Sequence, residues 1–177
     1  MMKTPRLLCF LALGFLLALV SCSKPPARDD KIEARNDAEF EQWLSNHRDV
    51  IPANERKEID EARQQLRYKV MTARPGLMSD AFAEALYAEI NGRTVDEVLA
   101  TSYDLQIERV EVELKNYAPM LARLETDSAK GYLTEDQKEA IATNLRQLRE
   151  KIAQREEDLK RLNARRAELP SSPAPTS

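Results

Sequence analysis

Apolar positions recur every three or four residues along most of the chain, which is the spacing of one face of an α-helix. No stretch alternates between apolar and polar residues as a half-buried strand does. The segments between breaks are rich in Ala, Leu, Glu, Lys, Arg and Gln, which favour helices. Gly76, Gly92 and Gly131 fall where the periodicity stops, and glycine is favoured just past helix ends because it adopts positive φ. The pattern predicts an all-α fold.

Three helices are expected within residues 36–92, over 37–47, 53–73 and 80–91. Asn36 and Ser79 are placed to cap the first and the third, and Pro52 suits the start of the second. Their apolar faces should pack against one another and against later helices as a small bundle. The residues of these faces are Phe40, Trp43, Leu44 and His47; Ile59, Ala62, Leu66, Val70 and Ala73; and Phe82, Leu86 and Ile90.

Residues 93–169 carry two heptad seams, the pattern of coiled coils. The capping box of Thr94 and Glu97 opens the first seam, and that of Thr134 and Gln137 opens the second. The seams consist of Tyr103, Ile107, Val110, Leu114, Tyr117, Leu121 and Leu124, and then Ile141, Leu145, Leu148, Ile152, Leu159 and Leu162.

Two arrangements fit these seams. They could form a long antiparallel, coiled-coil-like helical hairpin that turns at Gly131, or one continuous helix that dimerises with another chain. The hairpin is favoured because a capping box follows Gly131 and because the seams match in an antiparallel register. That register pairs Leu124 with Ile141, Tyr117 with Leu148, Leu114 with Ile152 and Tyr103 with Leu162.

Two arginines interrupt the returning seam. Arg155 is expected opposite Val110, with its head reaching Glu108 or Glu111 at the rim of the seam. Arg155 and Arg166 together mark a candidate partner-binding surface. In the first arm, Pro119 should kink the helix without breaking it, because the seam keeps its phase across the proline.

The N-terminal apolar run extends from Leu7 to Val20, after Lys3 and Arg6. Its 14 residues are fewer than the about 20 that a membrane-spanning helix needs. A basic start, a short apolar core and a small residue near the end are typical of a secretory signal peptide. A cleaved signal is therefore favoured over a retained transmembrane anchor.

The four residues Leu19-Val20-Ser21-Cys22 resemble the lipobox of bacterial lipoproteins. The resemblance implies that residues 1–21 are a signal peptide, that cleavage follows Ser21 and that Cys22 is lipidated. Residues 22–35 would then be a flexible tether to a membrane of the bacterial cell envelope. Because Ser23, and not aspartate, follows the cysteine, the resemblance favours the outer membrane, facing the periplasm, over the inner membrane.

Without residues 1–21, the 27 basic side chains lose Lys3 and Arg6, so 25 basic side chains face 30 acidic ones, a net charge of −5. This acidity argues against nonspecific binding to nucleic acid and predicts no basic patch for anionic lipid. Cys9 leaves with the signal and Cys22 carries lipid, so no thiol remains for a disulfide, a nucleophile or a metal. With His47 the only histidine, no catalytic triad or multi-histidine metal site can form, and no cofactor is expected.

The remaining candidates for chemistry have structural explanations. His47 is favoured as a helix cap over a lone base, and Phe40 and Trp43 as core residues over a ligand cage. Asn91–Val98 resembles a Gly-Lys-Thr-x-x-Glu-Ile/Val segment of small helical bacterial lipoproteins of unknown function. Gly92, Thr94 and Glu97 match that segment, and Arg93 stands for its lysine.

Two functions remain open. The favoured one is a non-enzymatic, lipid-anchored envelope lipoprotein that binds or spaces an envelope protein. The alternative is a small-molecule or peptide-binding module with a pocket lined by Phe40, Trp43, Phe82 and Tyr87. After Leu169, the Pro- and Ser-rich residues 170–177 should form a disordered tail.

Overall fold

The computed structural model describes residues 30–170. The predicted signal peptide, Cys22, the tether up to residue 29 and residues 171–177 of the predicted tail lie outside this range. Within it the chain forms five helices and no strand: α2 (Asp37–Asn46), α3 (Ala53–Ala73), α4 (Ser79–Ala88), α5 (Val95–Ser128) and α6 (Glu135–Ala167). The all-α prediction is confirmed.

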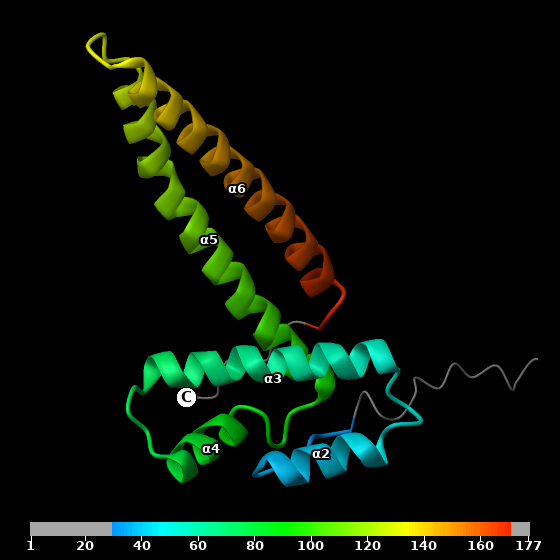
Figure 1. Ribbon diagram of the computed structural model, residues 1–177. Coiled ribbons are helices and arrows are strands. Elements are labelled where there is room, and N and C mark those ends of the chain that lie inside the picture. The colour runs from blue at the N-terminus through cyan, green and yellow to red at the C-terminus, as the bar shows by residue number, and fades with distance from the viewer. Residues whose placement is uncertain (1–29, 171–177) are drawn as a thin grey trace, which may run out of the picture.

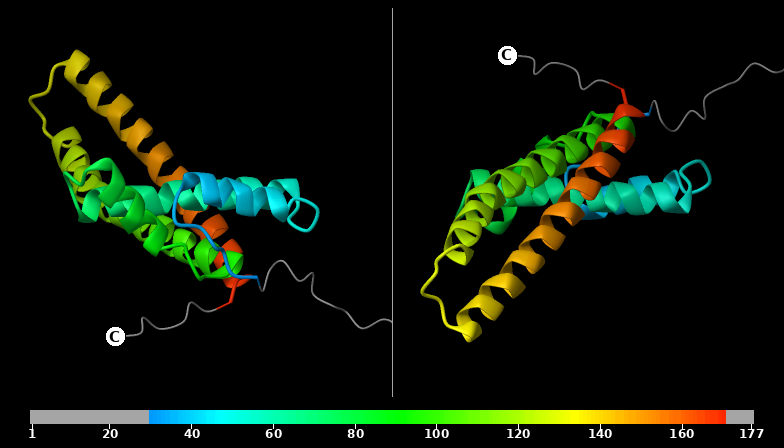
Figure 2. Two further views of the ribbon diagram at one scale, coloured as in Figure 1. Left: turned by 90° about the horizontal axis from the view of Figure 1, so that it is seen from below. Right: turned by 90° about the horizontal axis from the view of Figure 1, so that it is seen from above.

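The helices form a base and a projecting hairpin (Figure 1). In the base, α2 and α4 lie on one side of α3, and the first turns of α5 complete the bundle. Beyond α3, α5 and α6 run side by side as an antiparallel pair that extends away from the base (Figure 2). The two-part architecture of a small bundle and a long hairpin is therefore as expected, and a single continuous helix is excluded by the turn over residues 129–134.

The core of the base draws on every element around it. Phe40, Ile59, Leu66 and Ile90 are almost completely shielded from solvent. The start of the hairpin belongs to the same core, since it contributes Val95, Val98, Leu99 and Ala100, and Leu169 joins it from beyond α6. The predicted boundary between residues 92 and 93 therefore separates the short helices from the hairpin, but one hydrophobic core extends across it.

The segment Lys31–Arg35, assigned to the flexible tether, is part of the base. Ile32 and Ala34 are buried in the core cluster. The Ile32 amide donates to the Arg93 carbonyl at 2.7 Å, and the Gly92 amide donates to the Ile32 carbonyl at 2.8 Å. The Ala34 amide also donates to Asn91 Oδ1 at 3.1 Å. The prediction of a tether through residue 35 is wrong for these residues, because backbone bonds to the loop before α5 fix them in place.

The predicted helix starts are mostly confirmed. Asn36 caps α2, and the capping boxes of Thr94 with Glu97 and of Thr134 with Gln137 are both complete. Ser79 is not a cap: it is the first residue of α4, and Met78 occupies the cap position without a side-chain bond. Gly76 and Gly92 have φ values of +87° and +78°, as expected for residues that follow a helix end, but Gly131 does not adopt a positive φ.

The hairpin buries its seam only in part. Val110, Leu148 and Leu162 are buried, but most of the other seam residues stay half-exposed because only two helices share the seam. The helix α5 continues through Pro119 without a break. Two helices alone therefore leave apolar surface along the arms.

The ion pairs between the two arms join residues that the predicted register does not place opposite each other. Arg155 Nε lies 2.7 Å from Glu113 Oε2, one turn beyond the predicted neighbour Val110. Arg166 Nε lies 2.7 Å from Asp104 Oδ1, whereas the predicted pairing placed Leu162 at this level. The heptads do not exclude such an offset, because a shift of one turn keeps both apolar faces together.

Candidate interaction surfaces

The two predicted surface arginines are engaged within the chain. Arg155 bonds to Glu113 on α5 and, through a second nitrogen, to Asp158 at 3.1 Å. These bonds raise the pKa of Arg155. Arg166 donates through two nitrogens to the two carboxylate oxygens of Asp104, and it also donates to the Pro170 carbonyl. Both side chains therefore join α6 to α5, and Arg166 also fixes the end of α6. These contacts within the chain account for both arginines without a partner protein.

A cluster that the sequence did not reveal joins three helices at the open end of the hairpin. Arg165 on α6 donates to both carboxylate oxygens of Glu58 on α3, at 2.7 and 2.8 Å. Tyr103 on α5 donates its hydroxyl to the same carboxylate. The bond to Glu58 raises the pKa of Arg165 strongly. This cluster fastens both arms of the hairpin to the base.

A second cluster closes the base itself. The Tyr87 hydroxyl on α4 donates to Asp37 Oδ1 on α2 at 2.5 Å. Arg63 on α3 lies 3.1 Å from Glu41 and covers the ring of Phe40, with 4.7 Å between the guanidinium carbon and the ring centroid. These contacts join α2, α3 and α4 across the core. The ionisable side chains of Asp37, Arg63 and Tyr87 therefore hold helices together.

Both clusters make the protein sensitive to alkaline pH. Burial and then the bond to Glu58 raise the pKa of Tyr103 to about 12, and burial and then the bond to Asp37 raise the pKa of Tyr87 to about 12. The folded state holds these protons above the ordinary tyrosine pKa of about 10. Unfolding therefore releases them, and the stability that they contribute is present below about pH 10 and is lost as the pH rises toward about 12. Urea unfolding across this window should show that loss.

The matched comparison isolates the tyrosines from other groups that titrate in the same window. A Tyr87→Phe, Tyr103→Phe variant should start less stable but lose less stability than the wild type between about pH 10 and pH 12. Tyr132→Phe, at an exposed residue in the turn, should follow the wild type. An equal alkaline loss in the double variant would contradict the assignment of these bonds.

The aromatic residues proposed for a ligand pocket belong to the core. Phe40, Trp43 and Tyr87 are buried in the core cluster, and Phe82 packs against it. His47 caps α2, and its ring stacks on Trp43 at a centroid distance of 4.1 Å. Nδ1 of His47 donates to the Trp43 carbonyl at 2.7 Å. Helix capping and packing thus account for these side chains.

One face of α5 is left uncovered. Val112 and Met120 on this face are 52% and 53% exposed, whereas Val110 on the seam is buried. We define the open face of α5 as Leu105, Arg109, Val112, Asn116, Met120 and Arg123, which recur every three or four residues and include no acid. Leu105 at its lower end packs partly against the core of the base, so the uncovered apolar residues of this face are Val112 and Met120.

The open face begins in a crevice between α3 and α5. This groove of about 310 Å³ has Tyr68 on one wall and Leu105 and Val112 on the other, and Glu108 and Glu113 also line it. Arg109 lies over the Tyr68 ring, 5.9 Å from its centroid. Figure 1 shows α5 crossing α3 and extending beyond it, and the crevice lies between these two helices, so a helix lying along the open face would reach the crevice at its lower end.

The C-terminal part of α3 and the loop after it are rich in basic residues. No acidic residue occurs between Glu61 and Asp80, a stretch that holds Arg63, Arg67, Lys69 and Arg74. Arg63 and Lys69 pair with acidic residues, so only Arg67 and Arg74 of this stretch lack a carboxylate partner among the described residues. The expectation of no basic patch for anionic lipid stays a prediction, although the net charge of the whole chain conceals this local excess. The acid-free stretch itself was the signal.

Neither a metal site nor a known relative assigns a function to the chain. Among residues 30–170 no group of His, Cys, Asp and Glu side chains is arranged to hold a metal ion. None of the helices in that range is both long and apolar enough to cross a membrane. No family model, curated protein or solved structure matches the chain.

Proposed function

We propose that the protein is a non-enzymatic lipoprotein of the bacterial cell envelope, anchored through Cys22, whose hairpin binds another envelope protein. The open face of α5 carries this proposal. On an arm of about 50 Å it exposes the apolar side chains of Val112 and Met120, about two turns apart, and no helix among residues 30–170 covers them. The half-exposed hairpin seam adds to the apolar surface that a third helix would bury.

The open face also indicates the chemistry of its partner. Arg109 and Arg123 flank Val112 and Met120, and Arg123 also lies 3.9 Å from Asp127 one turn further along α5. An amphipathic helix with acidic residues beside its apolar face would complement both features, as in a helix-in-groove contact. The crevice beside Tyr68 would receive one end of that helix.

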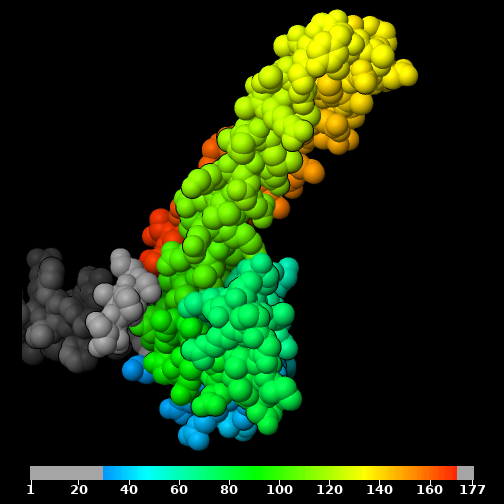
Figure 3. Space-filling model, turned by 90° about the vertical axis from the view of Figure 1, so that its left-hand side faces the viewer, coloured from blue at the N-terminus to red at the C-terminus, as the bar shows by residue number. Residues whose placement is uncertain are grey.

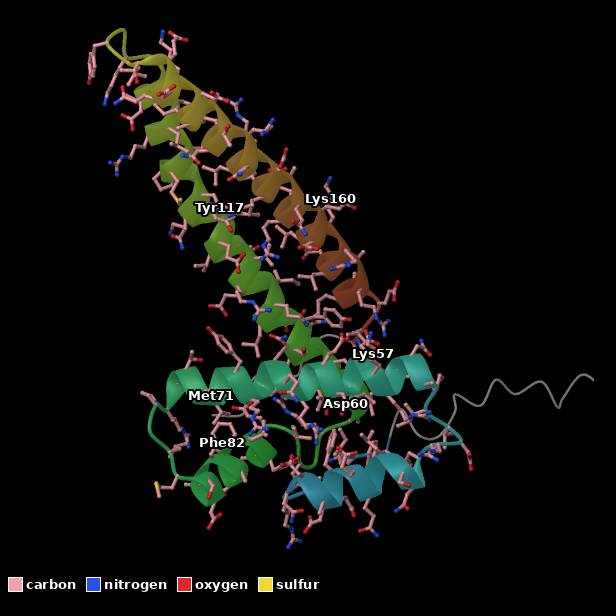
Figure 4. All side chains as sticks on the ribbon, viewed as in Figure 1. Lys57, Asp60, Met71, Phe82, Tyr117 and Lys160 are labelled. Atoms are coloured by element: carbon pink, nitrogen blue, oxygen red, sulfur yellow. The ribbon has the colours of Figure 1, made fainter. Side chains whose placement is uncertain are left out.

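A photo-crosslinking amino acid tests this proposal in living cells. Placed at Val112 or at Met120, it should capture the same envelope protein, because both residues lie on the open face. Placed at exposed Lys160 on α6, it should not (Figure 4). The three positions therefore compare the open face with the surface of the other arm.

Charge substitutions supply the matched control for the crosslinking. With the crosslinker at Asn116, in the middle of the open face, Val112→Glu together with Met120→Glu should abolish the capture, because two carboxylates would replace apolar contacts. Lys160→Glu also adds negative charge to the hairpin, but it lies outside the open face and should leave the capture unchanged.

Two results would contradict the proposal. One is that Val112 and Met120 capture only the background seen without the crosslinker. The other is that Lys160 captures the same protein equally well. The anchor has its own control: Cys22→Ala should leave an unprocessed precursor, and a processed, fully soluble wild-type protein would contradict lipidation at Cys22.

A further inference from the structure

We propose that the corner between α3 and α4 is a second membrane contact, which binds the anionic surface of a phospholipid bilayer. We define the corner as Arg67, Met71, Arg74, Leu77 and Met78. It lies at the C-terminal end of α3, away from the hairpin tip (Figures 1 and 3). The inference rests on the proposed lipid anchor, because that anchor is what brings the base to a membrane.

Two arginines of the corner form no ion pair within the described part of the chain. Arg63 lies within 4 Å of Asp37, Glu41 and Asp60, and Lys69 pairs with Glu89 at 3.0 Å. Arg67 and Arg74, by contrast, are exposed and have no carboxylate partner among residues 30–170. Arg67 lies over the Phe82 ring, 5.3 Å from its centroid. Two guanidinium groups are thus available to phosphate oxygens.

Exposed apolar side chains accompany these arginines. Met71 is 55% exposed and Met78 is 80% exposed, although methionine is usually buried. Beside Met71 lies a shallow groove of about 450 Å³, lined by Leu77 and Phe82 as well as both arginines, and by no acid. Figure 4 shows Met71 on α3 and Phe82 on α4 at this same end of the base. Apolar side chains beside arginines suit the boundary between head groups and acyl chains.

The position of the corner suits a second attachment. His47 Nε2 lies 3.5 Å from Asp30, and Arg56 donates to the Ile51 carbonyl, so the chain enters the base near the N-terminal end of α3. The corner lies at the other end of α3, about 30 Å away for its 21 residues. Contact at both ends would hold the base against the membrane and direct the hairpin away from it.

A lipid surface fits the corner better than a protein does. A stable protein interface uses about 20–30 residues on each side, and the corner offers only a handful. Each arginine near an anionic surface strengthens binding about fivefold, so two give about 25-fold. That gain is small for a free protein but decisive for one already held at the membrane by a lipid.

Thiol labelling of the lipidated full chain tests this contact. Met78→Cys protein is inserted into vesicles of phosphatidylcholine with phosphatidylglycerol, or of phosphatidylcholine alone, and is treated with a membrane-impermeant maleimide. Peptide mapping identifies the labelled cysteine, so Cys22 does not interfere. Residue 78 should react several-fold more slowly in the anionic vesicles, whereas Met120→Cys on the hairpin should react equally in both.

Arginine variants supply the matched control. Arg67→Gln with Arg74→Gln should weaken docking about 25-fold and restore fast labelling at residue 78. Arg123→Gln with Arg146→Gln removes the same charge from the hairpin and should leave the protection intact. Protection that survives the corner variant would mean that the arginines do not bind the surface, and would overturn the proposal.

The other outcomes separate this inference from the proposed function. A chain that fails to float with vesicles lacks the anchor, and the corner contact falls with it. A chain that floats while residue 78 reacts as fast as in neutral vesicles overturns the corner contact alone. Protection in envelope fragments but not in anionic vesicles would assign the corner to a protein partner instead, and would also overturn the proposal.

Discussion

Replacing Ile32 with alanine should lower the free energy of unfolding by about 2–4 kcal/mol, the usual cost of removing a large aliphatic side chain from a core. Ile32 has no exposed surface and belongs to the cluster that includes residues of α2, α3, α4 and α5. The backbone bonds on either side of it, to Arg93 and Gly92, would hold the chain in place and prevent collapse of the cavity. Urea unfolding followed by Trp43 fluorescence measures the loss.

The neighbouring residue is the matched control. Glu33 is exposed and lies in the same segment, so Glu33→Ala should change the stability by less than about 0.5 kcal/mol. If Ile32→Ala were as harmless as Glu33→Ala, the segment would behave as the flexible tether that the sequence suggested. If Ile32→Ala has the expected cost, any lipid tether that starts at Cys22 has to end before Lys31, which shortens the reach between Cys22 and the base.

Ile32 also shows why the sequence misled at this point. Its segment holds two apolar residues, Ile32 and Ala34, which are too few for any periodicity to appear. The contacts that order it come from Asn91, Gly92 and Arg93, far away along the chain. Such a pairing depends on tertiary structure, and no local sequence pattern predicts it.

Features governed by local interactions were predictable. The helix starts at Asn36, Thr94 and Thr134 depend on bonds between residues three apart, and each forms as expected. The turn near Gly131 follows from the same local chemistry. The hairpin register does not, because a heptad seam tolerates a one-turn shift and the choice depends on pairs such as Asp104 with Arg166.

The candidate interaction surfaces show the same difference between local features, which the sequence predicts, and tertiary contacts, which it does not. Arg155 and Arg166 stood out because they interrupt a seam, but each has a carboxylate partner on α5. The open face of α5 was already present as a second stripe of Val112 and Met120, hidden beside the stronger seam. Periodicity shows that a face is apolar, but only the fold shows whether another element covers it.

The cluster of Glu58, Tyr103 and Arg165 gives the second large effect. Arg165→Met should lower the free energy of unfolding by about 1.5–3 kcal/mol. The side chains of Glu58 and Arg165 are only 18% and 28% exposed, so loss of the guanidinium leaves a carboxylate in a poorly solvated position. Methionine keeps most of the apolar stem of arginine, so packing changes little. Breaking a fully buried pair would lower the stability further. The expected loss is smaller here because both side chains stay partly exposed.

A double-mutant cycle separates the pair from its surroundings. Glu58→Gln alone should also destabilise the fold, because Arg165 loses its charged acceptor. The two changes together should cost less than their sum, with a coupling energy of about 1–2 kcal/mol. Arg161→Met is the control: Arg161 pairs with Asp158 at the exposed surface of the same helix, and its loss should cost less than about 0.5 kcal/mol.

Hydrogen exchange locates the effect within the structure. Because Arg165 fastens the end of α6 to α3, its replacement should speed amide exchange in the last turns of α6 and around Leu162. Exchange near the turn, at the other end of the hairpin, should stay as in the wild type. A coupling energy near zero, or uniform loss of protection along both arms, would show that the hairpin is held to the base by its apolar contacts and not by this cluster.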